Sequence, residues 1–162
     1  MQRFLKSVVM MTAVCAATSV PVLLNTESAS ANEGMRGSYV GVGVSADGSG
    51  AAASATGRID LNPVSIRTTV TGACDSGLCA TLVVPTVTYD FGISKNANIY
   101  AGIGASAVSI SDSNSSVSLG TGAVVQAGAE GAISQNVVLY GDGTYFTNGG
   151  GTIWKVGVGY RF

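Results

Sequence analysis

Two cysteines, Cys74 and Cys79 in the segment CDSGLC, have the most distinctive chemistry in the chain. In an exported protein, such a pair is expected to form a disulfide that tightens a surface loop. A metal site is disfavoured because two thiols without a histidine supply too few ligands. A redox couple is disfavoured because the spacing is wider than Cys-x-x-Cys. The pattern therefore predicts a structural disulfide.

Acid–base chemistry has few candidate residues. The chain contains no histidine, which removes the usual participant of catalytic triads, histidine metal sites and most general-base schemes. Asp90 and Asp142 could form a pair of catalytic carboxylates, but basic residues are available to pair with them. The Gly-x-Gly runs at 41–43 and 157–159 lack a following helix whose N-terminus would hold a phosphate. We therefore expect neither an enzyme nor a cofactor-binding protein.

The overall composition is apolar and poor in charge. Only 10% of the 162 residues are charged and 46% are hydrophobic, whereas ordinary soluble domains contain about 25% charged residues. Disordered segments have low hydrophobicity, so this apolar composition does not indicate disorder. The net charge of −1 leaves no basic surface to neutralise phosphates, so nucleic-acid binding is not expected. The length allows one domain.

The start of the chain has the features of a secretory signal peptide. Basic residues come first, residues 7–24 form a mostly apolar stretch, and Ala29-Ser30-Ala31 provides the small residues that a signal peptidase accepts. We expect residues 1–31 to be removed and residues 32–162 to form the mature domain. The apolar stretch is somewhat long, so an uncleaved membrane anchor stays open as an alternative.

The mature domain alternates between apolar and polar residues. In TIWKVGVGYRF, which closes the chain, Trp154, Val156, Val158 and Tyr160 fall on one face. This period of two, with β-branched and aromatic residues, predicts a strand. No window has the capped period of 3.6 residues that marks an amphipathic helix. The same pattern predicts eight strands, over residues 37–46, 56–61, 64–72, 81–91, 98–110, 122–133, 136–146 and 152–162.

The connections between these strands alternate in length. Those at 47–55, 73–80 and 111–121 are long, polar and rich in serine and glycine, whereas those at 62–63, 92–97 and 134–135 are short. The last connection, 147–151, is short where a long one is due. An even strand number with long connections at one end and tight turns at the other is typical of bacterial outer-membrane barrels. The predicted fold is all-β: an eight-stranded antiparallel transmembrane up-and-down barrel, closed because lipid cannot satisfy open edges.

The charged residues of the predicted strands lie opposite the apolar face. If the apolar face contacts lipid, they point into the lumen, where four acids and four bases would balance, as buried ions require. The predicted lumen charge network consists of Arg58, Asp60, Arg67, Asp90, Glu130, Asp142, Lys155 and Arg161. The long connections contain three acids, Asp47, Asp75 and Asp112, and no lysine or arginine.

Aromatic residues of the apolar face gather at two levels. Such girdles mark the two membrane interfaces of outer-membrane barrels. The predicted interfacial aromatics are Tyr89, Phe91, Tyr160 and Phe162 near the short turns, and Tyr145 and Trp154 near the long connections. A soluble β-sandwich also alternates, but its strands point charges outward and require many more of them than this chain has.

The C-terminal part of the chain resembles a known group of proteins. The closing WKVGVGYRF, with its terminal Phe162, is similar to the strand by which outer-membrane β-barrels are recognised and inserted by the barrel-assembly machinery. Residues 81–162, which include TVTYDFGISKNANIYAGIGAS and AGAEGAISQNVVLYGDGTYF, resemble the second half of the small OmpA-like outer membrane protein β-barrel family. The resemblance implies a barrel domain only, in the cell outer membrane, with outer-membrane lipid and the assembly machinery as partners. Enzymes built on such barrels use histidine, which this chain lacks.

The predicted barrel is narrow, because eight strands leave an interior just wide enough for side chains. Small inward residues are expected to make room for Tyr39, Tyr100, Tyr140 and Phe146; they are Gly41, Gly43, Gly102, Gly104, Ser106, Gly122, Gly128, Gly157 and Gly159. We therefore expect a filled lumen and a structural or surface-interaction role. A narrow, porin-like pore for small solutes or ions and a secreted soluble β-rich adhesin stay open as alternatives. The long connections are the expected place for an extracellular ligand, which the sequence does not identify.

Overall fold

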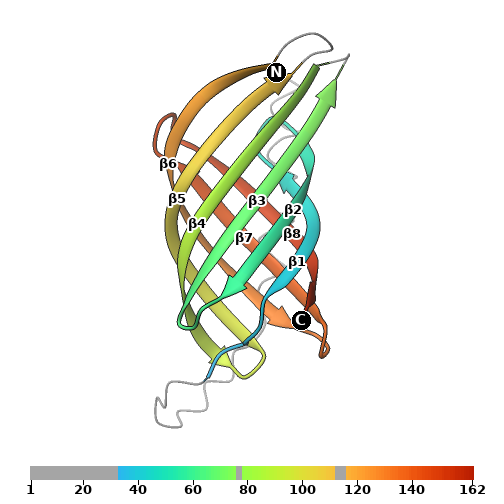
Figure 1. The fold of residues 1–162 in the computed structure, drawn as a ribbon, viewed down its shortest axis with the longest axis vertical. Coiled ribbons are helices and arrows are strands. Elements are labelled where there is room, and N and C mark those ends of the chain that lie inside the picture. The colour runs from blue at the N-terminus through green and yellow to red at the C-terminus, as the bar shows by residue number, and fades with distance from the viewer. Residues whose placement is uncertain (1–32, 76–77, 112–115) are drawn as a thin grey trace, which may run out of the picture. The chain divides into compact units, whose positions relative to one another are not determined.

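The computed structural model describes residues 33–75, 78–111 and 116–162, so the predicted signal peptide lies outside the described residues. These residues form one closed barrel of eight antiparallel strands, in which β8 pairs with β1 (Figure 1). The strands are β1 (Tyr39–Ala46), β2 (Ala51–Asp60), β3 (Val64–Asp75), β4 (Leu78–Ser94), β5 (Ala97–Ser111), β6 (Ser116–Ala132), β7 (Val137–Phe146) and β8 (Gly151–Arg161). The predicted fold class and strand number are confirmed. No helix in the described part of the chain is long and apolar enough to cross a membrane.

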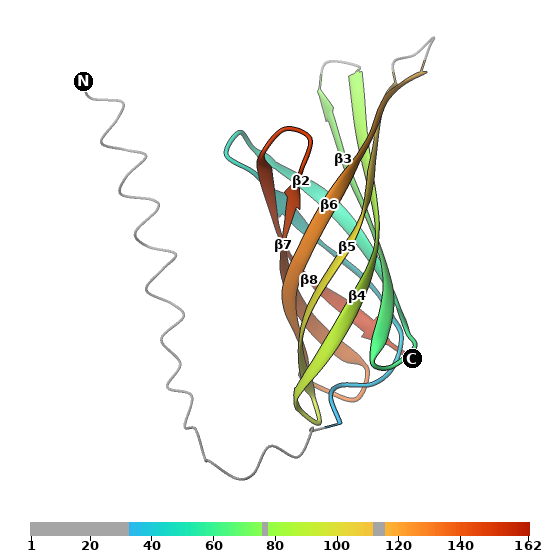
Figure 2. The same ribbon diagram turned by 90° about the vertical axis from the view of Figure 1, so that its left-hand side faces the viewer.

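The barrel has two different ends. The terminal end holds the described N-terminal residues and Phe162, and short turns at 61–63, 95–96 and 133–136 join its strands. At the opposite, distal end, residues 47–50 join β1 to β2 and residues 147–150 join β7 to β8 (Figure 2).

The predicted long connections are mostly strand. β2 begins at Ala51 and β6 begins at Ser116. β3 continues to Asp75, and β4 begins at Leu78. As a result, β2 has ten residues, where the sequence pattern predicted six. The prediction of long loops was wrong because these segments are rich in alanine, serine and glycine, which have little preference for strands. The hydrogen bonds between strands are made by backbone N–H and C=O groups, however, and almost any residue supplies these groups.

Strands β3 to β6 extend beyond the others at the distal end. They have 12, 17, 15 and 17 residues, against 8 to 11 in the other four. Their ends pair side by side and rise above the rim of the barrel (Figure 2). We call this projection the distal sheet; it comprises residues 73–75, 78–83, 107–111 and 116–122.

The barrel is polar inside and apolar outside. Among the described residues, seventeen polar or charged side chains are buried, against seven apolar ones. Large apolar side chains are exposed on every strand, and Val42, Ile103 and Val156 are each at least 64% exposed. Soluble proteins bury most such residues and expose charged ones. The closed single sheet with this inverted pattern is not a soluble β-sandwich.

Candidate functional site

Strand register brings two arginines together inside the barrel. Arg58 on β2 and Arg67 on β3 are direct cross-strand partners, and both are 2% exposed. Asp90 on β4 accepts hydrogen bonds from Arg58 Nη2 at 2.6 Å and from Arg67 Nη2 at 3.0 Å. One carboxylate therefore bridges two guanidinium groups whose repulsion would otherwise oppose the pairing of β2 and β3.

Glu130 on β6 closes this group from across the lumen. It accepts a hydrogen bond from Arg67 Nη1 at 2.8 Å, and its Oε1 lies 3.4 Å from Arg58 Nε. The Glu130 side chain is fully buried. Two acids thus face two bases in the interior, and their mutual attraction opposes the cost of removing four charges from water.

A second charged group lies closer to the distal end. Lys155 Nζ is 3.1 Å from Asp142 Oδ2 and donates hydrogen bonds to the hydroxyls of Thr56 at 3.1 Å and Thr69 at 2.5 Å. An ammonium group has three donors, so these three acceptors satisfy it. Asp142 also accepts a hydrogen bond from the hydroxyl of Tyr100 at 2.9 Å.

Tyrosine rings fill the space around the charges. The guanidinium of Arg67 lies 3.5 Å from the ring centroid of Tyr100, and the rings of Tyr39 and Tyr140 stack with centroids 5.6 Å apart. Each ring lies against a glycine where a Cβ atom would overlap it: Tyr39 against Gly159, Tyr100 against Gly128 and Tyr140 against Gly157. These three glycines therefore make room for tyrosines, as the sequence predicted, whereas a Cβ atom on Gly43, Gly102 or Gly104 would overlap the backbone of a neighbouring strand.

Two of the predicted lumen charges lie at the margin of the network. Asp60 Oδ1 is 3.4 Å from Arg58 Nη2, and the Asp60 side chain is 11% exposed. Arg161 ends β8, and its guanidinium donates to the backbone carbonyl of Gln135 at the terminal end. Within the described residues Arg161 forms no ion pair. Without these two residues, the inner charges are three bases and three acids, in place of the predicted four and four.

Uncharged polar residues complete the network and were missing from the predicted set. Ser65 accepts a hydrogen bond from Arg58 Nε at 3.0 Å and donates to Asp90. Gln126 donates to Asp142 at 3.0 Å. Each occupies the same inward phase as the charges on its strand, so the period-two pattern already contained the signal.

All six predicted interfacial aromatics point outward. Their exposed fractions are 47% for Tyr89, 50% for Phe91, 47% for Tyr145, 66% for Trp154, 59% for Tyr160 and 71% for Phe162. Trp154 lies opposite Gly143 on the neighbouring strand, and its ring covers that glycine. Outward aromatics therefore occur near both ends of the barrel.

The predicted disulfide between Cys74 and Cys79 is present. The two residues are cross-strand partners on β3 and β4, so the bond lies in the distal sheet and not in a loop as predicted. Of the loop acids, Asp112 lies outside the described residues and Asp75 is the last residue of β3. Asp47 accepts hydrogen bonds from the hydroxyl and amide of Ser49, which hold the pKa of its carboxyl group below the ordinary value.

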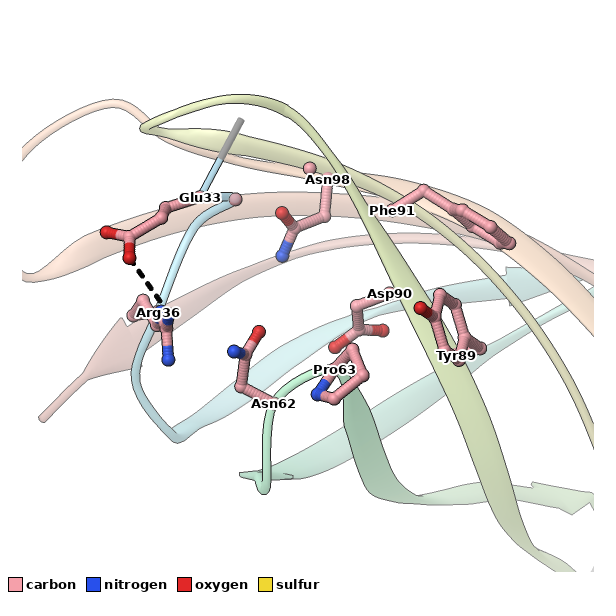
Figure 3. Close-up of a pocket in the computed structure, with 10 residues that line it drawn as sticks. Glu33, Arg36, Asn62, Pro63, Tyr89, Asp90, Phe91 and Asn98 are labelled. Atoms are coloured by element: carbon pink, nitrogen blue, oxygen red, sulfur yellow. Dashed lines mark ion pairs between the residues drawn. The ribbon is translucent and has the colours of Figure 1, made fainter. Parts of the chain in front are cut away.

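A pocket of about 410 Å³ opens at the terminal end beside the network (Figure 3). Asp90 and Asn98 line its inner side, and Glu33 and Arg36, from the segment before β1, line its outer side. Glu33 and Arg36 form an exposed ion pair at 3.5 Å. Among the described residues no group of three or more histidine, cysteine, aspartate or glutamate side chains is arranged to hold a metal ion.

Comparison with known proteins identifies the fold. Neither a family model nor a curated protein matches the chain. Solved structures do match: the N-terminal β-barrel domain of Pseudomonas aeruginosa OprF has a TM-score of 0.61 and 19% identity, covering 80% of this chain and 100% of that one. The outer membrane protein OprG from Pseudomonas aeruginosa has a TM-score of 0.55 and 11% identity, with coverages of 81% and 99%. Ail, the attachment invasion locus protein of Yersinia pestis, has a TM-score of 0.53 and 18% identity, with coverages of 79% and 100%. The chain has the fold of small outer-membrane barrels.

Proposed function

We propose that the protein is an outer-membrane barrel with a structural and surface-interaction role, a filled lumen and no catalytic activity. The apolar exterior is the observation that carries the membrane location. A surface on which every strand exposes large apolar residues is far larger than the patches that monomeric soluble proteins tolerate. The outward aromatics near both ends match the girdles of outer-membrane barrels.

The arrangement of charges supports a filled lumen. Arg67 and Glu130 bridge β3 and β6 across the interior, and Arg58, Asp90 and Tyr100 pack around them. These side chains satisfy one another, so ions passing through would have to separate buried pairs at high cost. In a planar bilayer, the folded protein should show no steady conductance. Steady single-channel openings would contradict the filled lumen and favour the narrow pore.

The distal sheet supports a role at the cell surface. Short turns of outer-membrane barrels face the periplasm, so the terminal end faces inward and the distal sheet projects outside. The pairing of β6 with β7 ends at Val124, and the pairing of β3 with β2 ends at Gly72. Beyond these residues β3 and β6 each pair with one strand in the described part of the chain, which gives the sheet two edges for a protein partner, apart from the Ala123 carbonyl, which accepts from Thr147. The disulfide fastens β3 to β4 close to one of these edges.

Export and assembly follow from the same proposal. Residues 1–31 would be removed as a signal peptide. Outer-membrane lipid would contact the apolar exterior, and the barrel-assembly machinery would recognise β8, on which Tyr160 points outward, followed by the outward Phe162.

The membrane location has a simple test on a detergent gel. An unboiled sample of the folded barrel should migrate differently from a boiled one, and the protein should fractionate with the outer membrane of cells that express it. A secreted soluble adhesin would appear in the culture medium and would give one band before and after boiling. That result would overturn the proposal.

A further inference from the structure

The segment before β1, residues 33–38, enters the mouth of the barrel at the terminal end. Met35 is 2% exposed and belongs to one buried apolar cluster with Tyr39, Val138 and Tyr140. Met35 therefore adds an apolar side chain to the filling next to tyrosines that lie opposite Arg58 and Glu130 in the strand register. The segment is therefore part of the lumen filling, although it lies outside every strand.

A single amide side chain holds Met35 in place. The Met35 backbone N–H donates to Asn98 Oδ1 at 2.8 Å, and the Met35 carbonyl accepts from Asn98 Nδ2 at 2.9 Å. Asn98 Nδ2 also donates to Glu130 Oε1 at 3.0 Å. Asn98 thus connects the segment directly to the acid that spans the lumen.

Two further hydrogen bonds join the segment to the network. The Gly37 N–H donates to Asp60 Oδ2 at 2.6 Å, and Arg58 Nη1 donates to the Gly37 carbonyl at 2.8 Å. Glycine is required twice along the segment. Gly37 has a φ of 103°, which side chains rarely allow, and a Cβ atom on Gly34 would overlap the Asn98 amide and the Gly92 backbone.

The rest of the segment is held by single hydrogen bonds: Phe162 N–H donates to the Ser38 carbonyl at 3.0 Å, Asp60 N–H donates to Ser38 Oγ at 3.2 Å, and Arg161 Nη1 donates to the Arg36 carbonyl at 3.4 Å. No strand ladder includes the segment, and its outer residues Glu33 and Arg36 expose 83% and 53% of their side chains. The 410 Å³ pocket lies beside it and reaches Asp90 and Asn98 (Figure 3). Local opening starts where buried contacts are few and ordered backbone is solvent-exposed. We propose that residues 33–38 are a detachable plug in the terminal mouth of the lumen, beside the pocket, with Asn98 as its latch; that this mouth faces the periplasm rests on the proposed function.

Chemical labelling of a buried cysteine tests the plug. Ser65→Cys in the mature domain places a thiol among the buried charges, where Ser65 is 0% exposed, and the two cysteines of that domain, Cys74 and Cys79, are joined in a disulfide. A charged, water-soluble methanethiosulfonate should label this thiol slowly in the folded barrel. Adding Met35→Gly or Asn98→Ala should raise the labelling rate by about tenfold or more, because each removes a main contact of the plug.

Two controls test whether the rise in labelling rate is confined to the terminal end of the barrel. Glu33→Gln alters the exposed end of the same segment and should leave the rate unchanged. Ser106→Cys, a reporter in the distal half of β5 that is 6% exposed, should react equally with and without Met35→Gly. The detergent-gel shift shows that each variant has folded. Gly34→Val, which displaces the segment by overlap and alters no strand, gives a second route to the open state.

An unchanged rate at Ser65→Cys in folded Asn98→Ala and Gly34→Val barrels would overturn the plug. Faster labelling at both reporters would also overturn it, because that result means a general loosening of the barrel. The failure of the proposed function and the failure of the plug can be told apart. Conductance through the wild-type barrel would contradict the filled lumen. The difference in labelling rate between the Ser65→Cys variants would still test the plug.

Discussion

The guanidinium of Arg67 and the carboxylate of Glu130 meet across the lumen at 2.8 Å, although their strands, β3 and β6, are not neighbours in the barrel. Their side chains are 2% and 0% exposed. The pair is held in place by Arg58 and Asp90, which contact it from β2 and β4. Removing the Glu130 carboxylate therefore leaves Arg67 to share Asp90 with Arg58, which has Asp60 as a second partner.

Glu130→Gln should lower the free energy of unfolding by about 3–5 kcal/mol, the usual cost of breaking a buried ion pair from one side. Urea unfolding of the barrel in lipid vesicles measures this change. Glu33→Gln is the matched control, because the Glu33–Arg36 pair is exposed and such pairs contribute only about 0–1 kcal/mol. Equally small effects of the two substitutions would contradict the structural importance of the lumen network.

Gly157→Ala should destabilise the barrel, because its Cβ atom would overlap the Tyr140 ring and lie 2.5 Å from the Val42 carbonyl. Overpacking of this kind costs about 1–3 kcal/mol. In Gly57→Ala the new Cβ atom meets nothing within 4 Å, so its unfolding curve should match that of the parent. A Gly157→Ala barrel as stable as the Gly57→Ala barrel would show that the ring does not fill this space.

Val42→Arg tests which face meets lipid. Val42 is exposed in the middle of β1, and an arginine near the bilayer midplane costs about 2–4 kcal/mol. Ile133→Arg, at the β6–β7 turn, should cost only about 0–1 kcal/mol because it lies near the interface. Folding equilibria in lipid vesicles give both values. If the exterior met water, neither arginine would change the folding free energy. That outcome would exclude a lipid-facing exterior.

The cysteines of the distal sheet should show no free thiol in unreduced protein purified from envelopes. A thiol-reactive dye should detect two thiols per mature chain only after reduction. The barrel itself should survive reduction, because the bond closes a short hairpin outside the lumen. Two reactive thiols in the unreduced protein would contradict the disulfide.

Much of the barrel could be predicted from the sequence, because one physical rule repeats in every strand. The period of two separates a face for lipid from a face for the lumen, so inward Arg67 and outward Val156 follow from phase alone. The same phase marks Ser65 and Gln126 as inward polar residues. Partners across the lumen did not follow, because the pairing of Arg67 with Glu130 depends on the curvature that closes the sheet.

Three features of the structure had weak signals in the sequence: the distal sheet, the segment before β1 and the position of Arg161. The parts of the distal sheet that were predicted as loops, 73–80 and 111–121, are rich in serine, glycine and alanine, whose strand preference is low. The segment at residues 33–38 has no periodicity, and nothing local indicates that Met35 is buried. Arg161 fits the inward phase, but it ends β8, and its side chain binds the Gln135 carbonyl at the mouth of the barrel.

Fluorescence of Trp154, the single tryptophan of the chain, tests the membrane-spanning account most directly. Its side chain is 66% exposed on the outer surface of β8. In lipid vesicles its emission should be quenched strongly by bromine atoms on the acyl chains and weakly by iodide in the water. Strong quenching by iodide with no effect of brominated lipid would show that this face meets water, and would contradict the account.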